Sequence, residues 1–149
     1  MAKIVLYYSR TGNTKRMADK IAEGAGAVCK SILEFNPQDL INYDAIVIGS
    51  PTQYGSMAWE VKKFIDETAS LHNKLDGKIG GAFSSSGTVG GGSETTILGI
   101  LHAMLIHGMI IQGDPARDHY GITSVGFPNE DTQNKCFQQG VRISKLCEK

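Results

Sequence analysis

The chain has 149 residues, of which 41% are hydrophobic and 20% are charged. This length and composition exclude a disordered or fibrous chain and predict a single domain over residues 1–149. Lysine plus arginine and aspartate plus glutamate number 15 each, so no net charge draws the molecule toward nucleic acid or an anionic membrane. The three cysteines form no Cys-x-x-Cys pair, and no apolar run reaches the ~18 residues of a membrane span. We therefore expect a cytoplasmic protein with no disulfide framework and with no membrane or nucleic-acid partner.

The first third of the chain alternates apolar segments with one amphipathic segment. Residues 4–8 form a continuous apolar run, as expected of a strand buried on both faces. Apolar residues then recur at helical spacing over 17–25, and a weaker strand follows over 28–33. Asn36-Pro37 indicates a turn. We therefore expect at most one helical turn before the next apolar strand, over 45–48.

The rest of the chain repeats the alternation. Helical spacing over 61–68 precedes an apolar strand over 79–83. A third amphipathic segment over 97–104 leads to a weaker strand over 109–111, and a last helix is expected over 137–144. Five strands alternating with about four helices predict an α/β fold in which helices cover both faces of a parallel sheet.

Three of these strands end alike, with a small polar residue followed by a loop that contains glycine. The loops cover residues 9–14, 50–55 and 84–92. In an open α/β sheet, ligands bind beyond the carboxyl ends of the strands. We therefore expect the three loops to meet at one edge of the sheet and to form the binding site.

The first loop has the residue types of a phosphate site. It carries hydroxyls at Ser9, Thr11 and Thr14 and an amide at Asn13, next to the conformationally permissive Gly12. Backbone N–H groups at a helix start carry partial positive charge and lack intrahelical partners, so a phosphate satisfies them. The alternative is an ordinary helix cap made by Thr11 or Asn13. Because a cap needs one such side chain and four are present, the pattern favours phosphate.

Several other kinds of site lack their residues. There is no Gly-Lys-[Ser/Thr] of a nucleotide-hydrolysing P-loop and no Gly-x-Gly-x-x-Gly after the first strand. Ser9 and Ser50 stand at strand ends where a magnesium-dependent phospho-acceptor would need carboxylates. His102 and His107 are five residues apart, which disfavours a metal site on one helix face. The serines of 84–86 lack the Gly-x-Ser-x-Gly turn of hydrolases.

The loops resemble those of a known family. Tyr8–Thr14 resembles the phosphate loop of flavodoxins, and Gly49–Met57 resembles their second, flavin-facing loop. Phe83–Thr88 with Gly90–Gly92, followed by a helix that ends in His107–Met109, is similar to the tetrameric NAD(P)H:quinone oxidoreductase branch of the same superfamily. The resemblance covers nearly the whole chain. It implies a flavodoxin-like, doubly wound, five-stranded parallel sheet in the order 2-1-3-4-5.

The resemblance further implies FMN as the cofactor, with its phosphate in the first loop and its ring between the second and third. The cofactor-binding residues it implies are Ser9, Arg10, Thr11, Gly12, Asn13, Thr14, Pro51, Thr52, Gln53, Tyr54, Gly55, Ser84, Ser85, Ser86, Gly87, Thr88, Gly91 and Tyr120. The peptide at Gly55 would turn toward flavin N5 on reduction, which glycine makes easy. Tyr54 and Tyr120 are expected to flank the ring, the alternatives being a surface turn and a loop anchor.

Four further residues, one tryptophan, one histidine and two cysteines, lie outside the expected FMN contacts. Trp59, at a helix start, is expected to pack or to contact a partner rather than to stack on the flavin. His107 matches the histidine that faces the quinone pocket in the reductase branch, and it is also an ordinary helix C-terminal residue. Cys136 and Cys147 lie eleven residues apart on the last expected helix, so we expect them to be buried and without a redox role.

Two functions remain open. The first is an FMN-containing electron carrier, monomeric or homodimeric, that serves ferredoxin or a flavodoxin reductase and oxidoreductase acceptors; the short length and the first loop favour it. The second is an NAD(P)H-dependent quinone oxidoreductase, favoured by the third loop, by His107 and by the zero net charge, since flavodoxins are commonly acidic. A third reading is an FMN-binding module without redox turnover.

Overall fold

The computed structural model describes all 149 residues. Five strands and two helices make up the first part of the chain: β1 (Lys3–Tyr7), α1 (Asn13–Ala25), β2 (Val28–Ser31), β3 (Ala45–Gln53), β4 (Ser56–Met57), α2 (Trp59–Glu67) and β5 (Ile79–Ser86). The remainder contains α3 (Ser93–Ile106), β6 (Ile110–Ile111), β7 (Thr123–Val125) and α4 (Glu130–Cys147). Between β2 and β3 the chain forms two short 3-10 helices, Ile32–Glu34 and Pro37–Asn42, and a third, Thr68–Leu71, extends α2. No α-helix lies between β2 and β3, but the expectation of at most one helical turn was too low, because two 3-10 helices form there.

The sheet is parallel and doubly wound, which confirms the expected fold class. Its strands lie in the order β2-β1-β3-β5-β6, while β4 pairs antiparallel with β3 and β7 pairs parallel with β5. The sheet therefore contains seven strands rather than five. The order 2-1-3-4-5 holds only when β4 is set aside and β6 and β7 are counted together as the fifth strand.

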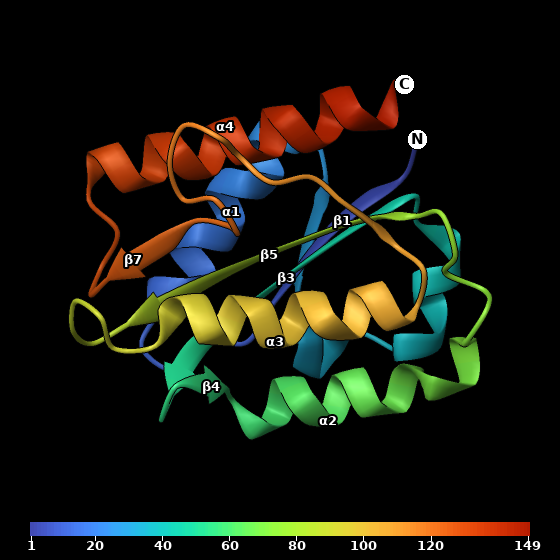
Figure 1. The fold of residues 1–149 in the computed structure, drawn as a ribbon, viewed down its shortest axis with the longest axis horizontal. Coiled ribbons are helices and arrows are strands. Elements are labelled where there is room, and N and C mark those ends of the chain that lie inside the picture. The colour runs from blue at the N-terminus through green and yellow to red at the C-terminus, as the bar shows by residue number, and fades with distance from the viewer.

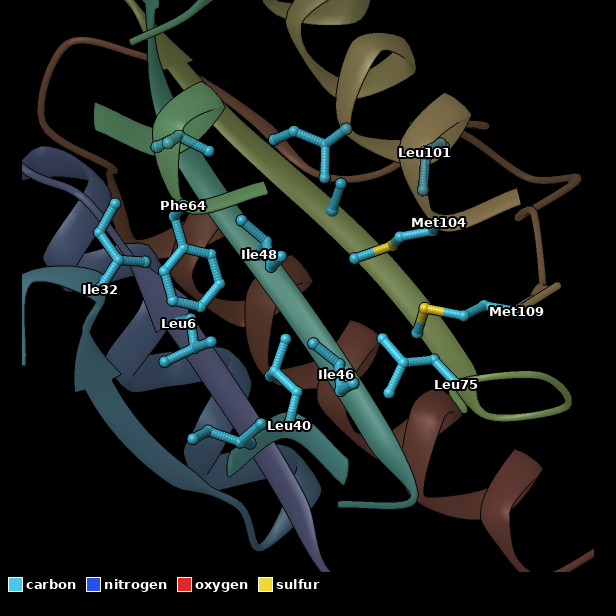
Figure 2. Close-up of a cluster of buried hydrophobic side chains, with 14 of the residues drawn as sticks. Leu6, Ile32, Leu40, Ile46, Ile48, Phe64, Leu75, Leu101, Met104 and Met109 are labelled. Atoms are coloured by element: carbon cyan, nitrogen blue, oxygen red, sulfur yellow. The ribbon is translucent and has the colours of Figure 1, made fainter. Parts of the chain in front are cut away.

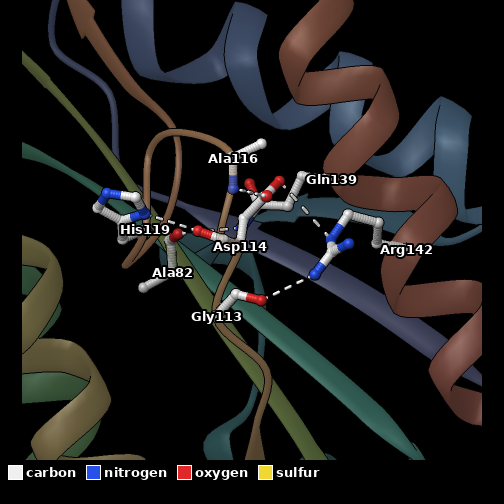
Figure 3. Close-up of polar contacts among 7 residues, drawn as sticks. All are labelled: Ala82, Gly113, Asp114, Ala116, His119, Gln139 and Arg142. Atoms are coloured by element: carbon white, nitrogen blue, oxygen red, sulfur yellow. Dashed lines mark hydrogen bonds and ion pairs between the residues drawn. The ribbon is translucent and has the colours of Figure 1, made fainter.

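The fifth strand is broken because residues 112–122 leave the sheet. β6 pairs with β5 at Ile79 and Gly80, and β7 pairs with it again only from Ser84 to Ser86. In the gap, the side-chain amide of Gln139 on α4 donates to the Ala82 carbonyl at 3.3 Å, which replaces part of the missing strand pairing (Figure 3).

Polar contacts hold the departing segment against α4. The Arg142 guanidinium donates to the Gly113 carbonyl at 2.7 Å and lies 3.8 Å from the Asp114 carboxylate. His119 Nδ1 lies 2.7 Å from the Asp114 carbonyl, and the Ala116 N–H donates to the Asp114 side chain at 2.9 Å (Figure 3). The segment is therefore a folded excursion of the chain that carries its own hydrogen bonds.

Helices cover both faces of the sheet, α1 and α4 on one and α2 and α3 on the other (Figure 1). Successive strand residues point to opposite faces, and β1 shows this directly. Its Ile4 and Leu6 pack with Phe64 of α2 and Ile100 of α3, whereas Val5 packs in the cluster of α1 and α4. Figure 2 shows the first of these clusters, with apolar side chains from the sheet and from both helices filling the layer between them.

Two cysteines belong to the second cluster. Cys136 and Cys147 on α4 are buried, as expected, and burial raises the pKa of the Cys136 thiol to about 12. A thiol that stays protonated is a poor nucleophile.

None of the helices combines the length and the apolarity that crossing a membrane requires.

Candidate functional site

The first loop ends at a helix that its own side chains do not cap. Gly12 has φ of 97°, and its N–H donates to Ser9 Oγ at 3.0 Å, which closes the loop tightly. No side chain accepts a hydrogen bond from the first turn of α1, and neither Thr11 nor Asn13 makes a side-chain hydrogen bond within the chain. The structure therefore contradicts the alternative that Thr11 or Asn13 caps the helix. The N–H groups of the first turn and both side chains are left for an external acceptor.

Thr14 differs from the other polar residues of this loop. Its side chain is buried, and its hydroxyl lies 2.9 Å from Ser85 Oγ. This bond ties the first loop to the third, and the expected contact between the Thr14 hydroxyl and a phosphate stays a prediction. The burial of Thr14 could have been predicted from the helical spacing, because Thr14 shares a helix face with the buried Met17 and Ala18.

Arg10 joins the first loop to the start of α2. Its guanidinium lies 3.6 Å from Glu60, Nε donates to the Tyr8 hydroxyl at 3.4 Å, and the charged group stands 5.8 Å from the centre of the Tyr8 ring. Burial opposes ionisation of Glu60, but the Tyr8 hydroxyl and the Arg10 charge outweigh it and lower the pKa of this carboxyl. The side chain of Arg10 is thus held by the protein, while its backbone amide remains at the loop.

The second loop is a tight hairpin between β3 and β4. Thr52 pairs with Met57 and Gln53 with Ser56, so Tyr54 and Gly55 form a two-residue turn. Both turn residues have positive φ, 48° and 77°, as the favoured hairpin turns require. The Tyr54 side chain is fully exposed at the tip, where its ring is free to cover a planar ligand.

The third loop divides into a buried and an exposed half. Ser84 and Ser85 are buried, so only their backbone groups are available to a ligand. Ser86 Oγ donates to the Thr88 carbonyl at 2.9 Å, and the N–H of Gly91 donates to the same carbonyl at 3.1 Å. Pro51 is half-buried, whereas Gly87, Thr88 and Gly91 lie exposed.

Residues that the sequence reasoning missed join the second and third loops. Gly92 has φ of 105°, and a Cβ on it would stand 2.6 Å from the Cα of Gly55. The Thr95 hydroxyl lies 2.6 Å from the Gly55 carbonyl and 2.9 Å from the Gly92 carbonyl. Thr96 donates to Thr52 Oγ1 at 3.3 Å, and Thr52 Oγ1 lies 2.9 Å from Ser84 Oγ. In the sequence, three consecutive glycines followed by Ser-x-Thr-Thr at a helix start could have pointed to these residues.

α3, like α1, begins without a side-chain cap, after Gly92. Two uncapped helix starts therefore lie at the carboxyl ends of β1 and β5 in the same sheet. Within the three loops only Arg10 carries a charge, and no group of His, Cys, Asp and Glu side chains is placed to hold a metal. Hydroxyls, free amides and positive helix ends fit the phosphate and the polar chain of a flavin mononucleotide.

The two remaining aromatic candidates differ in position. Tyr120 lies on the segment that leaves the sheet, is 47% exposed and precedes Gly121. Trp59 opens α2 and is 66% exposed; it lines a surface hollow together with Arg10 and Gln53. It makes no aromatic pair, and its expected packing or contact with a partner stays a prediction.

His107 lies far from the loops within this chain. It follows the last residue of α3, whereas the loops adjoin the first, and a helix of 14 residues is about 20 Å long. Its Nε2 lies 2.8 Å from the Thr68 hydroxyl, and its ring centre is 6.1 Å from that of His72. A role of His107 at the flavin ring is therefore not available within one protomer, because α3 runs the length of the sheet.

Comparisons with known proteins agree with this geometry. A family model described as the flavodoxin domain matches residues 4–96, more than half of the chain. An NAD(P)H dehydrogenase (quinone) of Archaeoglobus fulgidus is 36% identical over 100% of this chain and 99% of its own. A flavodoxin of Aquifex aeolicus is 35% identical over 95% of this chain and 84% of its own. The alignment with the Archaeoglobus protein spans 189 positions, against 149 residues here.

Solved structures show the same fold. A flavodoxin from the domain Archaea superposes with a TM-score of 0.84 at 30% identity, over 100% of both chains. The WrbA-like flavodoxin of Agrobacterium tumefaciens superposes with a TM-score of 0.88 at 24% identity, over 99% of this chain and 97% of that one, a likeness of fold alone. With the sheet order, the three loops and the matched domain in agreement, the chain belongs to the flavodoxin family.

Proposed function

We propose that this protein binds FMN at the three-loop edge and carries electrons between redox proteins. The observation that carries the proposal is the first turn of α1, which no side chain caps and beside which Thr11 and Asn13 remain free. A phosphate at this position would accept from the loop amides and from these two side chains, with no lysine needed.

The other loops would hold the rest of the cofactor. Exposed Tyr54 at the hairpin tip offers a ring to cover a planar group. Tyr120 lines a cavity with Gly80, Ile111 and Arg142 rather than with the loops, so its place beside the ring stays a prediction. The backbone of the third loop, from Ser84 to Thr88, offers amides to the polar end of the ring. When bound, FMN supplies one- and two-electron redox chemistry, and the protein sets its potential through the groups around it.

Two features favour a carrier. The loops contain no pair of acidic and basic side chains for proton transfer, since Arg10 is their single charged residue. The chain also has 40 fewer residues than the 189 positions of its alignment with the quinone dehydrogenase of Archaeoglobus, so it lacks segments of that relative. Ferredoxin or a flavodoxin reductase would be the donor, and oxidoreductases the acceptors.

A specific observation also supports the second candidate, an NAD(P)H-dependent quinone oxidoreductase. The relative that carries this name is 36% identical across all of this chain, about as similar as the one named flavodoxin. The two functions differ in turnover, because a reductase must accept hydride from a nicotinamide directly.

The deciding experiment is an anaerobic reduction assay. FMN-loaded protein is mixed with NADH or NADPH, and the loss of yellow colour is followed before and after addition of a benzoquinone. If the protein is a carrier, NADH or NADPH should reduce its FMN no faster than they reduce an equal concentration of free FMN. The carrier should then bleach when a flavodoxin reductase is added. Rapid bleaching by nicotinamide alone, reversed by quinone, would instead establish the reductase; failure to bind FMN would contradict both.

A further inference from the structure

The outer face of α3 is apolar. Its inner residues, such as Ile100 and Met104, fill the core. On the opposite side Leu105 and Ile106 are 56% and 74% exposed, with exposed His102 and partly exposed Leu98 beside them. No charged residue occurs in α3 after Glu94. A helix that is apolar on all sides is normally buried on all sides.

The other helices of the molecule do not share this feature. Ion pairs line their outer surfaces, for example Lys15 with Asp19 on α1, Lys62 with Asp66 on α2 and Lys135 with Asp131 on α4. No ion pair involves α3. The contrast within one molecule makes the outer face of α3 a candidate for contact with a partner, whereas the outer faces of the other helices are typical of surfaces exposed to water.

We propose that a second copy of this chain covers α3, in a two-fold dimer with the two α3 helices antiparallel. Leu98 lies four residues before His102 and Ile106 four residues after it, so the three form one stripe that is symmetric about His102. A two-fold axis through the stripe sets Leu98 against Ile106 of the second copy and His102 against His102. An interface of this kind requires a patch that matches itself, and this stripe does.

Two observations favour a second copy over a redox partner. Leu105 and Ile106 lie at the end of α3 remote from the loops, about 20 Å from its start, so a partner seated there would be far from the electron-transferring edge. The chain also has no net charge, and the face itself carries no carboxylate or ammonium, so two copies meet without repulsion and without an oppositely charged partner to attract.

The size of the face sets the expected strength. One outer face of a helix about 20 Å long and 10 Å wide is well below the ~800 Å² that each partner contributes to a standard interface. The dimer should therefore be weak and should form only at high protein concentration.

The first test is sedimentation velocity of the purified protein from low micromolar to millimolar concentration. The wild type should shift from monomer to dimer over this range, and Ile106→Lys should weaken the association at least tenfold. Leu33→Lys is the matched control, because Leu33 is 70% exposed against 74% for Ile106 and lies on the 3-10 helix that follows β2; it should dimerise as the wild type does. Unchanged circular dichroism and Tm verify that both variants are folded.

A second test probes the axis directly. His102→Cys should give a disulfide-linked dimer under mild oxidation, because the two cysteines would face each other, and Leu33→Cys should not. A wild type that stays monomeric at all concentrations would overturn the proposal. So would a dimer that survives Ile106→Lys unweakened, or one that His102→Cys fails to link.

Discussion

Gly92 is the residue on which the second and third loops depend. Its φ of 105° is one that side-chain-bearing residues rarely adopt, and a Cβ would stand 2.6 Å from the backbone of Gly55. We expect Gly92→Ala to displace the hairpin tip and to weaken FMN binding at least tenfold. Gly90→Ala is the control, since Gly90 also has positive φ, 69°, but open space around it. Both variants should lose about 1 kcal/mol of stability from backbone strain, and only Gly92→Ala should lose affinity. Equal affinities in a fluorescence titration would contradict the contact.

Thr11 is the hydroxyl that the first loop leaves free for a phosphate. Thr11→Val removes one donor to a charged group and should weaken FMN binding by roughly 1 to 3 kcal/mol. Riboflavin, which has the same ring and no phosphate, is the matched ligand, and its affinity should not change. Flavin fluorescence titrations measure both. If the affinity for riboflavin falls as much as the affinity for FMN, Thr11 acts on the fold of the loop and not on the phosphate.

The site could be located from sequence more readily than its side chains could be assigned. Small polar residues at the ends of apolar strands predict which loops meet, because parallel strands end at one edge. Which hydroxyl faces a ligand depends on the neighbours it finds after folding. Thr14 turns inward to Ser85 and Thr52 toward Ser84, and both bonds join loops more than 30 residues apart in the chain.

At the scale of the elements, α1 and α4 cross at a pair of glycines. A Cβ on Gly140 of α4 would fall on the Ile21 carbonyl, and one on Gly24 of α1 would fall on the Phe137 carbonyl. The helices therefore approach backbone to backbone. Replacing glycine by alanine inside a helix normally stabilises it by up to ~1 kcal/mol. Here the clash must separate two helices, which costs about 1 to 3 kcal/mol.

Gly140→Ala should accordingly lower the free energy of unfolding. Gly99→Ala in α3 is the control, because its Cβ would meet only the flexible end of Met57 at 3.2 Å, and it should be neutral or stabilising. Urea unfolding at a fixed pH compares the two variants with the wild type. A Gly140→Ala variant as stable as Gly99→Ala would show that the two helices can separate without loss.

The same scale explains why helices were easier to predict than the last strand. Apolar residues at helical spacing located all four α-helices. The expected amphipathic character is wrong for α3, because Leu105 and Ile106 on its outer side are also apolar. β6 contributes two residues and β7 three, and the 11 residues between them leave the sheet to bond with α4 through Arg142 and Asp114. Segments this short carry no periodic signal, so their pairing with β5 is decided by long-range contacts.

For the whole molecule, α3 connects two chemically different ends. Its first residues border the loops at the carboxyl ends of the strands, and its last residue is followed by His107 at the opposite end of the sheet. There Thr68 donates its hydroxyl to the Ile65 carbonyl at 2.6 Å, so it accepts from Nε2–H of His107. Nδ1 of that ring is buried without a partner. A proton on Nδ1 would therefore be a buried charge without a hydrogen-bond acceptor.

This arrangement predicts a loss of stability on mild acidification. Burial, and secondarily the neighbouring His72, lowers the pKa of His107 below its usual 6.5. Above that pH the ring is neutral in both the folded and the unfolded state and contributes no pH dependence. As pH falls below about 6.5, the unfolded chain takes up the proton first, so the free energy of unfolding should decline, by at most ~1.4 kcal/mol per pH unit for this one group, until the pH reaches the folded-state pKa. His107→Gln should flatten the decline between pH 6.5 and 5 in urea unfolding series, with parallel curves above pH 7. His119→Gln, at an exposed position remote from Thr68, should keep the wild-type slope, and a slope that survives in His107→Gln would assign the decline to another group.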